Sequence, residues 1–134
     1  MLLFAVIVCA IHALEHIVVG KDVEQIFQNF GSFYRELTSE SQLRWIGPEK
    51  GVLHLASAAI LNALWDLWAK LEGRPLWRLL VDLQPEQLVD CIDFRYISDA
   101  MSCEEALEIL RAGKQGQAER IAFLQKNGFP AYVL

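Results

Sequence analysis

The sequence predicts a mostly helical fold, and three observations support this prediction. Apolar residues recur at steps of three and four through most of the chain, which is the spacing of one face of an α-helix. Glycine and proline punctuate these runs, as helix ends require. With 134 residues, of which 54% are hydrophobic and 22% charged, the chain has the size and composition of one folded domain.

The first two helices are predicted over residues 2–19 and 23–37. The first is apolar on nearly every side and ends at Gly20, a residue type that favours helix C-termini. Asp22 can cap the second helix with its carboxylate. A helix as apolar as the first must be covered by other structure, and the chain begins inside it. We therefore expect that the N-terminus is truncated.

The third helix is predicted over residues 52–72, after a turn at Gly47 and Pro48. It has a broad apolar face and only a narrow polar stripe. Asp66 and Lys70 lie four residues apart on that stripe, with the acid on the N-terminal side, which favours an ion pair. We expect this helix to be buried on most sides. The apolar face is formed by Leu53, Ala56, Ile60, Ala63, Leu64, Leu67 and Leu71, and Trp65 and Trp68 widen it.

The rest of the chain predicts shorter elements. A short helix starts at Pro75, and Ser102 with Glu105 forms a capping box that opens another. The stretch CIDFRYI mixes β-branched and aromatic residues and predicts an extended segment. The final AYVL resembles the opening of a strand. The expected ranges are helices at 75–82, 103–112 and 117–127, and the extended segment at 91–97.

Charge and targeting signals exclude several classes of function. The net charge is −5 and no basic run is present, so the chain is not expected to bind nucleic acid. No Lys or Arg precedes Lys21, so a signal peptide is not expected, and His12, Glu15 and His16 interrupt the apolar segment before it could span a membrane. An odd number of cysteines without close spacing favours reduced thiols and an intracellular protein.

One short pattern invites a zinc-enzyme hypothesis. His12, Glu15 and His16 match the H-x-x-E-H arrangement, in which two histidines on one helical face bind zinc and the glutamate acts as base. His54 is the only other histidine, so the chain offers few third ligands. The alternative is a helix end whose polar side chains reach solvent, and we favour that alternative.

The remaining candidate residues favour structural roles. His54 is expected to be partly buried and hydrogen-bonded. Cys9 lies among aliphatic residues and is expected to be unreactive, whereas Cys103 follows a helix cap that could lower its pKa. Three aspartates do not match a calcium loop and are expected to be solvated. These are Asp90, Asp93 and Asp99, and the tryptophans are predicted to be core and helix-contact residues.

A long motif in the third helix resembles a known family. Residues 58–80, AAILNALWDLWAKLEGRPLWRLL, resemble the amino-domain signature of the mandelate racemase and muconate-lactonizing branch of the enolase superfamily. Leu61 and Val81 depart from it, where the family commonly has an acidic residue and glycine. The resemblance is carried by Ala63, Leu64, Trp65, Asp66, Leu67, Ala69, Lys70, Gly73, Pro75, Leu76, Leu79 and Leu80.

Other stretches are similar to one subgroup of that family, the L-fuconate dehydratases. These are LTSESQLRWIGPEKGVLHLASAA, CIDFRYISDA and GFPAY. The resemblance covers essentially the whole chain, except that Val133 and Leu134 stand where the subgroup usually has polar residues. It implies that residues 1–128 are the helical part of an α+β capping domain and that 129–134 begin the first strand of a TIM barrel.

The resemblance also implies the chemistry of a complete relative. Mg²⁺ held by three carboxylates stabilises an enediolate after a base removes the proton α to a carboxylate. Loss of the β-hydroxyl then gives a 2-keto-3-deoxy sugar acid. The bases are a Lys-x-Lys pair and a late His–Asp pair on the barrel, and this chain contains neither a Lys-x-Lys pair nor a histidine beyond His54. We therefore assign no catalytic, metal or substrate residue, and expect no Mg²⁺ to be bound by this chain.

One polar loop could contact the barrel, although a structural role suits it equally. It contains Arg44, Trp45, Glu49 and Lys50. Our main hypothesis is the helical cap of an L-fuconate dehydratase-like enzyme, inactive alone and tending to self-associate or to pack on the barrel. Mitochondrial placement follows only from the resemblance. The alternatives are a non-catalytic helical interaction protein, favoured by the apolar first helix, and a small zinc hydrolase.

Overall fold

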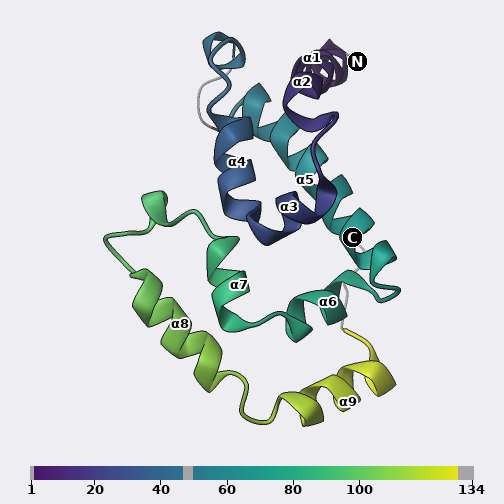
Figure 1. Cartoon of the computed structure of the whole chain (residues 1–134), viewed down its shortest axis with the longest axis vertical. Helices are drawn as coiled ribbons and strands as arrows, with labels where there is room; N and C mark the ends of the chain where they lie inside the picture. Colours follow the sequence, from purple (N-terminus) through teal and green to yellow (C-terminus); the bar gives the residue numbers. More distant parts are fainter. Residues whose placement is uncertain (1, 47–49, 130–134) are drawn as a thin grey trace. The chain divides into compact units, whose positions relative to one another are not determined.

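The computed structural model describes residues 2–46 and 50–129 (Figure 1). The described residues form helices and contain no β-strand, so the predicted mostly helical fold is confirmed. The chain divides into two compact units, Met1–Asp93 and Phe94–Leu134. The helices are α1 (Leu2–Ala13), α2 (Glu15–Val18), α3 (Val23–Gln28), α4 (Phe30–Thr38), η1 (Leu43–Trp45), α5 (Val52–Leu71), α6 (Leu76–Asp82), α7 (Pro85–Asp90), η2 (Phe94–Tyr96), α8 (Cys103–Ala112) and α9 (Gln117–Asn127).

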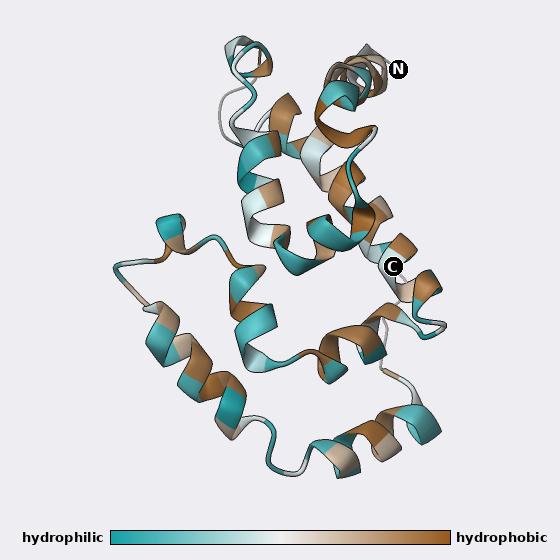
Figure 2. Cartoon of the chain, in the orientation of Figure 1, coloured by the Kyte–Doolittle hydropathy of each residue, from teal (hydrophilic) through white to brown (hydrophobic). Residues whose placement is uncertain are grey.

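Helix α5 is the centre of the first unit, because α1, α4, α6 and η1 all pack against it. The longest helix is also strongly apolar, as Figure 2 shows. One face of α5 carries the core residues Leu53, Ala56, Ile60 and Leu64. The predicted face was too wide, however, since Ala63, Leu67 and Leu71 are exposed. The apolar pattern alone did not indicate which residues of α5 contact another helix.

Two predicted helices are each divided in the structure. The first breaks at Leu14, which is fully buried and whose backbone turns between α1 and α2. The second begins at Asp22, which caps α3 as predicted by accepting hydrogen bonds from two backbone N–H groups, but breaks at Asn29, where φ is −142° and ψ is 47°. In both cases the apolar spacing continues across the break, so periodicity could not reveal it.

Stacked aromatic rings join α3 and α4 to α5. Trp65 and Trp68 lie on α5 with their ring centroids 5.4 Å apart. Phe27 stacks on Trp68 at 4.5 Å, and Phe30 packs on Trp65 at 4.3 Å. These two tryptophans therefore have the helix-contact role that was predicted for them. Trp45 does not, because it is 88% exposed.

Helix α7 was not predicted, and it approaches α4 closely. Pro85 occupies its first position, and the side chain of Gln87 accepts a hydrogen bond from the backbone N–H of Gln84 at 2.9 Å. At its C-terminal end the carbonyl oxygen of Asp90 lies against Gly31 of α4, where a Cβ atom would come within 2.1 Å of that oxygen. Gly31 is buried, so the contact between α4 and α7 depends on the absence of a side chain there.

The extended segment predicted at 91–97 is wrong. The N–H groups of Cys91 and Ile92 bond back to the carbonyls of Leu88 and Val89, which continues α7 into a turn. The following residues form the 3₁₀ helix η2. A β-branched and aromatic composition favours a strand only where a partner strand is present, and the described residues contain none.

The second unit contains α8 and α9, and its helix ends agree with the sequence. Ser102 and Glu105 form the predicted capping box, with hydrogen bonds of 2.8 and 3.2 Å between each side chain and the other residue's N–H. Helix α9 ends at Asn127, followed by Gly128. Ala106 is the one buried residue on these two helices. This unit therefore has little hydrophobic core of its own.

Among the described residues, α5 is the one helix long and apolar enough to cross a membrane by length and composition. The same properties suit the core helix of a globular protein. Here α5 packs against three other α-helices and carries the predicted Lys70–Asp66 ion pair, 2.5 Å between nitrogen and oxygen. The turn predicted at Gly47–Pro48 lies outside the described residues, as does the strand start predicted at 129–134 apart from Phe129.

Candidate functional site

The residues of the zinc-enzyme hypothesis lie on the surface and do not assemble. His12 is at the end of α1, whereas Glu15 and His16 belong to α2, and all three are exposed. A ring nitrogen of His16 is 2.8 Å from the carbonyl oxygen of Ala13, so it is occupied locally. Across residues 2–46 and 50–129, no three His, Cys, Asp or Glu side chains are grouped as metal ligands. The favoured interpretation, a solvated helix end, agrees with this arrangement.

His54 is half-buried and hydrogen-bonded, as predicted. Its Nδ1 accepts a hydrogen bond of 3.0 Å from the backbone N–H of Lys50, one turn before it. Lys50 has a positive φ of 66°, a backbone conformation that residues other than glycine adopt rarely. His54 therefore fixes a turn at the start of α5.

The three cysteines are free thiols in different environments. Cys103 begins α8 and is exposed. Cys9 is exposed too, although it lies among apolar residues at a cavity lined by α1 and η1, so burial does not support the unreactivity expected for it. Cys91 is half-buried and donates to the carbonyl of Gln87 at 3.2 Å. Burial, followed by the charge of Asp90, raises the pKa of the Cys91 thiol to about 11, which makes it a poor nucleophile.

The described aspartates and the described part of the polar loop lie mostly on the surface. Asp90 and Asp99 are exposed. Arg44 and Trp45 are exposed on η1, and Lys50 is exposed before α5, while Glu49 lies outside the described residues. The sequence did not reveal the apolar cavity that lies beside this loop. Residues of α1 and η1 line an apolar cavity of about 370 Å³, formed by Ala5, Val6, Cys9, Ala10, Ala13, Leu43 and Ile46.

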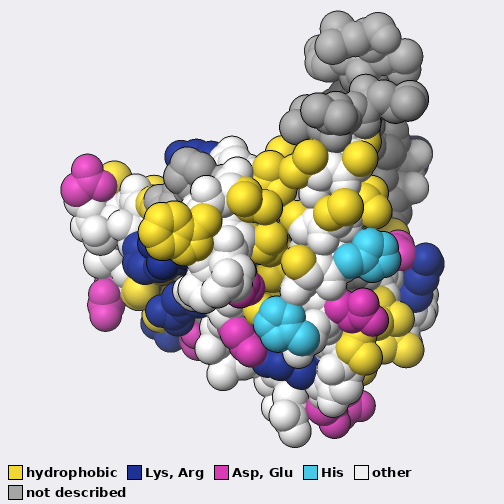
Figure 3. Space-filling model, turned by 90° about the horizontal axis from the view of Figure 1, so that it is seen from above, with side chains coloured by type: hydrophobic (Ala, Val, Ile, Leu, Met, Phe, Trp, Pro, Cys, Tyr) yellow, Lys and Arg dark blue, Asp and Glu magenta, His cyan; other side chains and the backbone are white. Residues whose placement is uncertain are grey.

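Two large apolar side chains beside that cavity are exposed in the described structure. Ile46, which lines the cavity, is 62% exposed, and its neighbour Trp45 is 88% exposed. Phe4 and Val8 of α1 are exposed too, but they are not among the cavity-lining residues. Seen from above, hydrophobic side chains gather over part of the surface, among charged and histidine side chains (Figure 3). Soluble proteins seldom expose contiguous apolar surface of this kind except at contact sites. We call the surface of Trp45, Ile46 and the cavity-lining residues the α1–η1 surface.

A second cavity, of about 640 Å³, lies beside α3 and α4 and is more polar. Lys21 and Glu36 form an ion pair at its edge, and the Lys21 ammonium lies 5.5 Å from the ring centroid of Phe33. Asp22 also lines the cavity, where its carboxylate accepts the capping hydrogen bonds of α3, and Gln25, Asn29 and Ser32 add neutral polar groups. No acid–base pair of the kind that catalysis needs lines this cavity.

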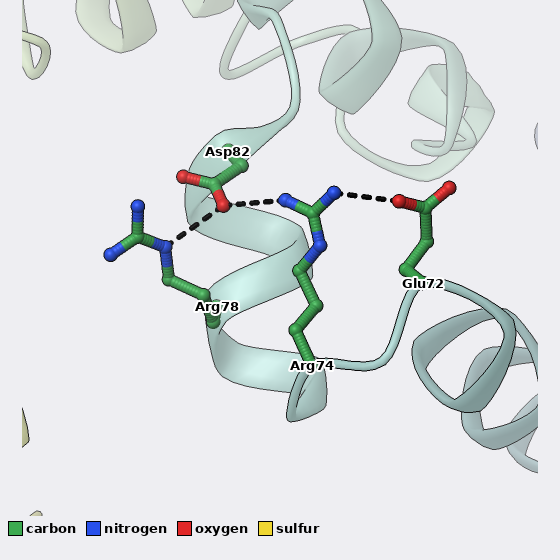
Figure 4. Close-up of polar contacts among 4 residues, drawn as sticks. All are labelled: Glu72, Arg74, Arg78 and Asp82. Atoms are coloured by element: carbon green, nitrogen blue, oxygen red, sulfur yellow. Dashed lines mark hydrogen bonds and ion pairs between the residues drawn. The ribbon is translucent and has the colours of Figure 1, made fainter.

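Charged residues at the corner between α5 and α6 form a network that runs from the family motif to Asp82 (Figure 4). Arg74 donates to Glu72 at 2.6 Å and to Asp82 at 2.7 Å, and Arg78 donates to the same oxygen of Asp82 at 2.8 Å. These hydrogen bonds, that from Arg78 first, lower the pKa of Asp82. The hydrogen bond to Glu72, followed by that to Asp82, raises the pKa of Arg74.

This network holds the corner that Gly73 opens with a φ of 64°. Its chemistry is structural, because each carboxylate oxygen that takes part is bound to a guanidinium within the network. Sequence reasoning did not identify it. The available signal was the four-residue spacing of Arg78 and Asp82, which places both on one face of α6.

The fold and the motif define the class of protein. Residues 5–81 match the family described as mandelate racemase / muconate lactonizing enzyme, N-terminal domain. The chain belongs to this family, as the resemblance in α5 and α6 predicted. The match begins inside α1 and ends one residue before the end of α6, so it includes most of the first unit's core and Glu72, Arg74 and Arg78 of the network, but not Asp82.

Particular relatives extend the match beyond that domain. The chain is 62% identical over 128 residues to mitochondrial enolase superfamily member 1 of Xenopus laevis and 60% identical to the human protein of that name. It is 50% identical over 131 residues to L-galactonate dehydratase of Hypocrea jecorina. These matches cover 95–96% of this chain and 29% of each relative, so the chain spans less than a third of their length.

A solved structure shows the same fold. The crystal structure of human mitochondrial enolase superfamily member 1 superposes with a TM-score of 0.90 at 59% sequence identity. The superposition covers 96% of this chain and 29% of that one. The mostly helical architecture is therefore that of one part of a much longer homologous chain.

Proposed function

We propose that this chain is the helical part of the capping domain of an acid-sugar dehydratase of the enolase superfamily. One observation carries the proposal: the sequence is 50% identical over 131 residues to a relative named as a dehydratase of a sugar acid, L-galactonate. In a complete enzyme of this type the substrate is an acid sugar, such as L-fuconate, and Mg²⁺ stabilises the enediolate that forms from it. Dehydration then gives a 2-keto-3-deoxy sugar acid.

In this proposal the chain itself contributes shape and contact surface rather than reacting groups. Its histidines are exposed or bonded to backbone groups, and its half-buried thiol is held protonated. Three carboxylates grouped for Mg²⁺ are not present among the described residues. The Mg²⁺ ligands and the bases would come from the part of the enzyme that corresponds to the other 71% of the relatives, and the compartment would be the mitochondrion that two relatives' names give.

The experiment compares the purified chain with an intact relative. Each is incubated with Mg²⁺ and either L-fuconate or L-galactonate, and the 2-keto-3-deoxy product is measured. The L-galactonate dehydratase serves as the positive control. We expect product from the control and none from this chain. Product formed by the chain alone, in proportion to its concentration, would contradict the proposal.

The partner that we propose for the α1–η1 surface is the remainder of such an enzyme, and a second copy of the chain when that remainder is lacking. The exposed apolar side chains favour this, since contact would remove them from water. Sedimentation over a range of concentrations tests it, with Trp45→Ser plus Ile46→Ser as the variant. We expect association that the variant weakens. A monomer at every concentration would contradict self-association.

A non-catalytic helical interaction protein is the second candidate function. The same α1–η1 surface favours it, because contact with another protein would bury these side chains equally well. The two candidates differ in what the chain can replace. If the chain is a capping domain, a related dehydratase in which this chain replaces the matching residues should still dehydrate its substrate. An unrelated interaction protein should not support that activity.

A further inference from the structure

The C-terminal end of α9 contains an asparagine–glycine pair. Asn127 is the last residue of the helix and Gly128 follows it, and both are exposed. The chain has two other asparagines, Asn29 and Asn62, which precede phenylalanine and alanine respectively. The pair at α9 is therefore the one place in the sequence where an asparagine side chain meets a following residue without a side chain.

That pairing has a specific chemistry. The backbone nitrogen of Gly128 can attack Cγ of Asn127, so that the N–Cγ bond forms, the Cγ–Nδ2 bond breaks and ammonia leaves with the proton of the glycine nitrogen. Water then opens the resulting five-membered imide and gives aspartate or isoaspartate. Glycine favours the attack because no Cβ crowds the nitrogen, and no atom of the described residues beyond its chain neighbours lies within 4 Å of where a Cβ would stand at Gly128.

The helix end opposes this attack through two hydrogen bonds. The N–H of Gly128 donates to the carbonyl of Leu124 at 2.8 Å, which keeps the nucleophilic nitrogen occupied. Nδ2 of Asn127 donates to the carbonyl of Phe123 at 2.9 Å, which holds the side-chain amide back over the preceding turn. Both bonds must break before Cγ and the glycine nitrogen can meet.

Little else stabilises that last turn. No residue of α9 is buried, and Phe123 is 63% exposed. Helix ends with few buried contacts open readily without unfolding of the whole protein. We propose that Asn127–Gly128 is a spontaneous deamidation site whose rate is set by opening of the last turn of α9. This inference does not depend on the proposed function.

The product would make the opening permanent. A carboxylate at position 127 cannot donate to the carbonyl of Phe123, and it places a negative charge at the negative end of the helix dipole. The last turn of α9 is therefore destabilised once the amide is lost, and isoaspartate would further disturb it by adding a carbon to the backbone.

The test is incubation of the full chain in mildly alkaline buffer, followed by proteolysis and mass spectrometry of the three asparagine peptides. Deamidation adds about one dalton, and isoaspartate is separated by chromatography. We expect Asn127 to react at least about tenfold faster than Asn29 and Asn62, because only its neighbour lacks a side chain. In urea, where α9 is unfolded, we expect the Asn127 rate to rise severalfold.

Two variants sharpen the result. Asn127→Gln should abolish the signal from this peptide, and Gly128→Ala should slow it in urea, where the helix end no longer contributes. A native rate for Asn127 no higher than those of Asn29 and Asn62 would overturn the site. Equal rates of Asn127 deamidation with and without urea would show that opening of the last turn of α9 does not control the reaction.

Discussion

Ser57 has none of its surface exposed, and its hydroxyl has no hydrogen-bond partner among the residues that the structure describes. It lies on α5 next to Ala56, which is also fully buried. Burial of an unpaired hydroxyl costs free energy, and serine is a weaker helix former than alanine. The residue therefore lowers the stability of the core helix in which it lies.

Ser57→Ala should raise the free energy of unfolding by about 1 kcal/mol, since it removes the unpaired hydroxyl and improves helix propensity. Urea denaturation followed by circular dichroism measures the change. Ser32→Ala, on the exposed side of α4, is the control and should change stability by less than about 0.5 kcal/mol. A less stable Ser57→Ala variant would mean that the hydroxyl has a partner.

Cys91 makes a prediction about pH. Because burial raises the pKa of its thiol from about 9 to about 11, its thiolate form is scarce at neutral pH. We expect a thiol reagent to label Cys9 and Cys103 first, as both are exposed, and the labelling rate of Cys91 to climb until the pH nears 11. Peptide mapping after timed labelling measures this. A Cys91 rate that levels off near pH 9 would contradict it.

The same shift has a consequence for stability. A thiol whose pKa is raised on folding contributes stability that is present below about pH 9 and is lost as the pH rises toward 11. Relative to Cys91→Ala, the native protein should therefore lose stability across that window.

At the scale of elements, the contact between α4 and α7 depends on Gly31. Gly31→Ala places a Cβ 2.1 Å from the carbonyl oxygen of Asp90, so the two helices must separate. We expect a loss of about 1–3 kcal/mol in the free energy of unfolding, the usual cost of overpacking. Thermal unfolding measures the loss. A Gly31→Ala protein as stable as the unaltered chain would show that α7 does not lie where described.

The aromatic rings predict a measurable coupling between α3 and α5. Phe27 and Trp68 lie nearly parallel, with 4° between their planes. A double-mutant cycle with Phe27→Leu and Trp68→Leu should give about 0.5–1.5 kcal/mol of interaction free energy. Trp77→Leu on α6, combined with Phe27→Leu, is the control pair. Coupling that does not exceed that of the control would contradict the stack.

The elements that sequence could predict are those with a local signal. Asp22 and the Ser102–Glu105 box cap their helices in the structure because a cap needs only neighbouring residues. The breaks at Leu14 and Asn29 left no such signal. Residues 91–97 resembled a strand because composition reports a preference, whereas a strand also requires a partner. Gly31 became informative only when Asp90 was seen beside it.

At the scale of the whole molecule, the family could be predicted and the contact surface could not. The motif of residues 58–80 is long enough to predict the family, and the match over residues 5–81 confirms that prediction. The α1–η1 surface combines residues that are some forty positions apart, such as Val6 and Ile46. Their proximity follows from the packing of α1 and η1 on α5, which no local pattern encodes.

The most direct test of the account replaces the matching 131 residues of the Hypocrea jecorina L-galactonate dehydratase with this chain. Dehydration of L-galactonate by the chimera, in the presence of Mg²⁺, is measured beside the unaltered enzyme and a chimera carrying Gly31→Ala. The account predicts that the first chimera folds and forms product, and that the Gly31→Ala chimera is less stable. A folded chimera that binds Mg²⁺ but forms no product would contradict a capping role for this chain.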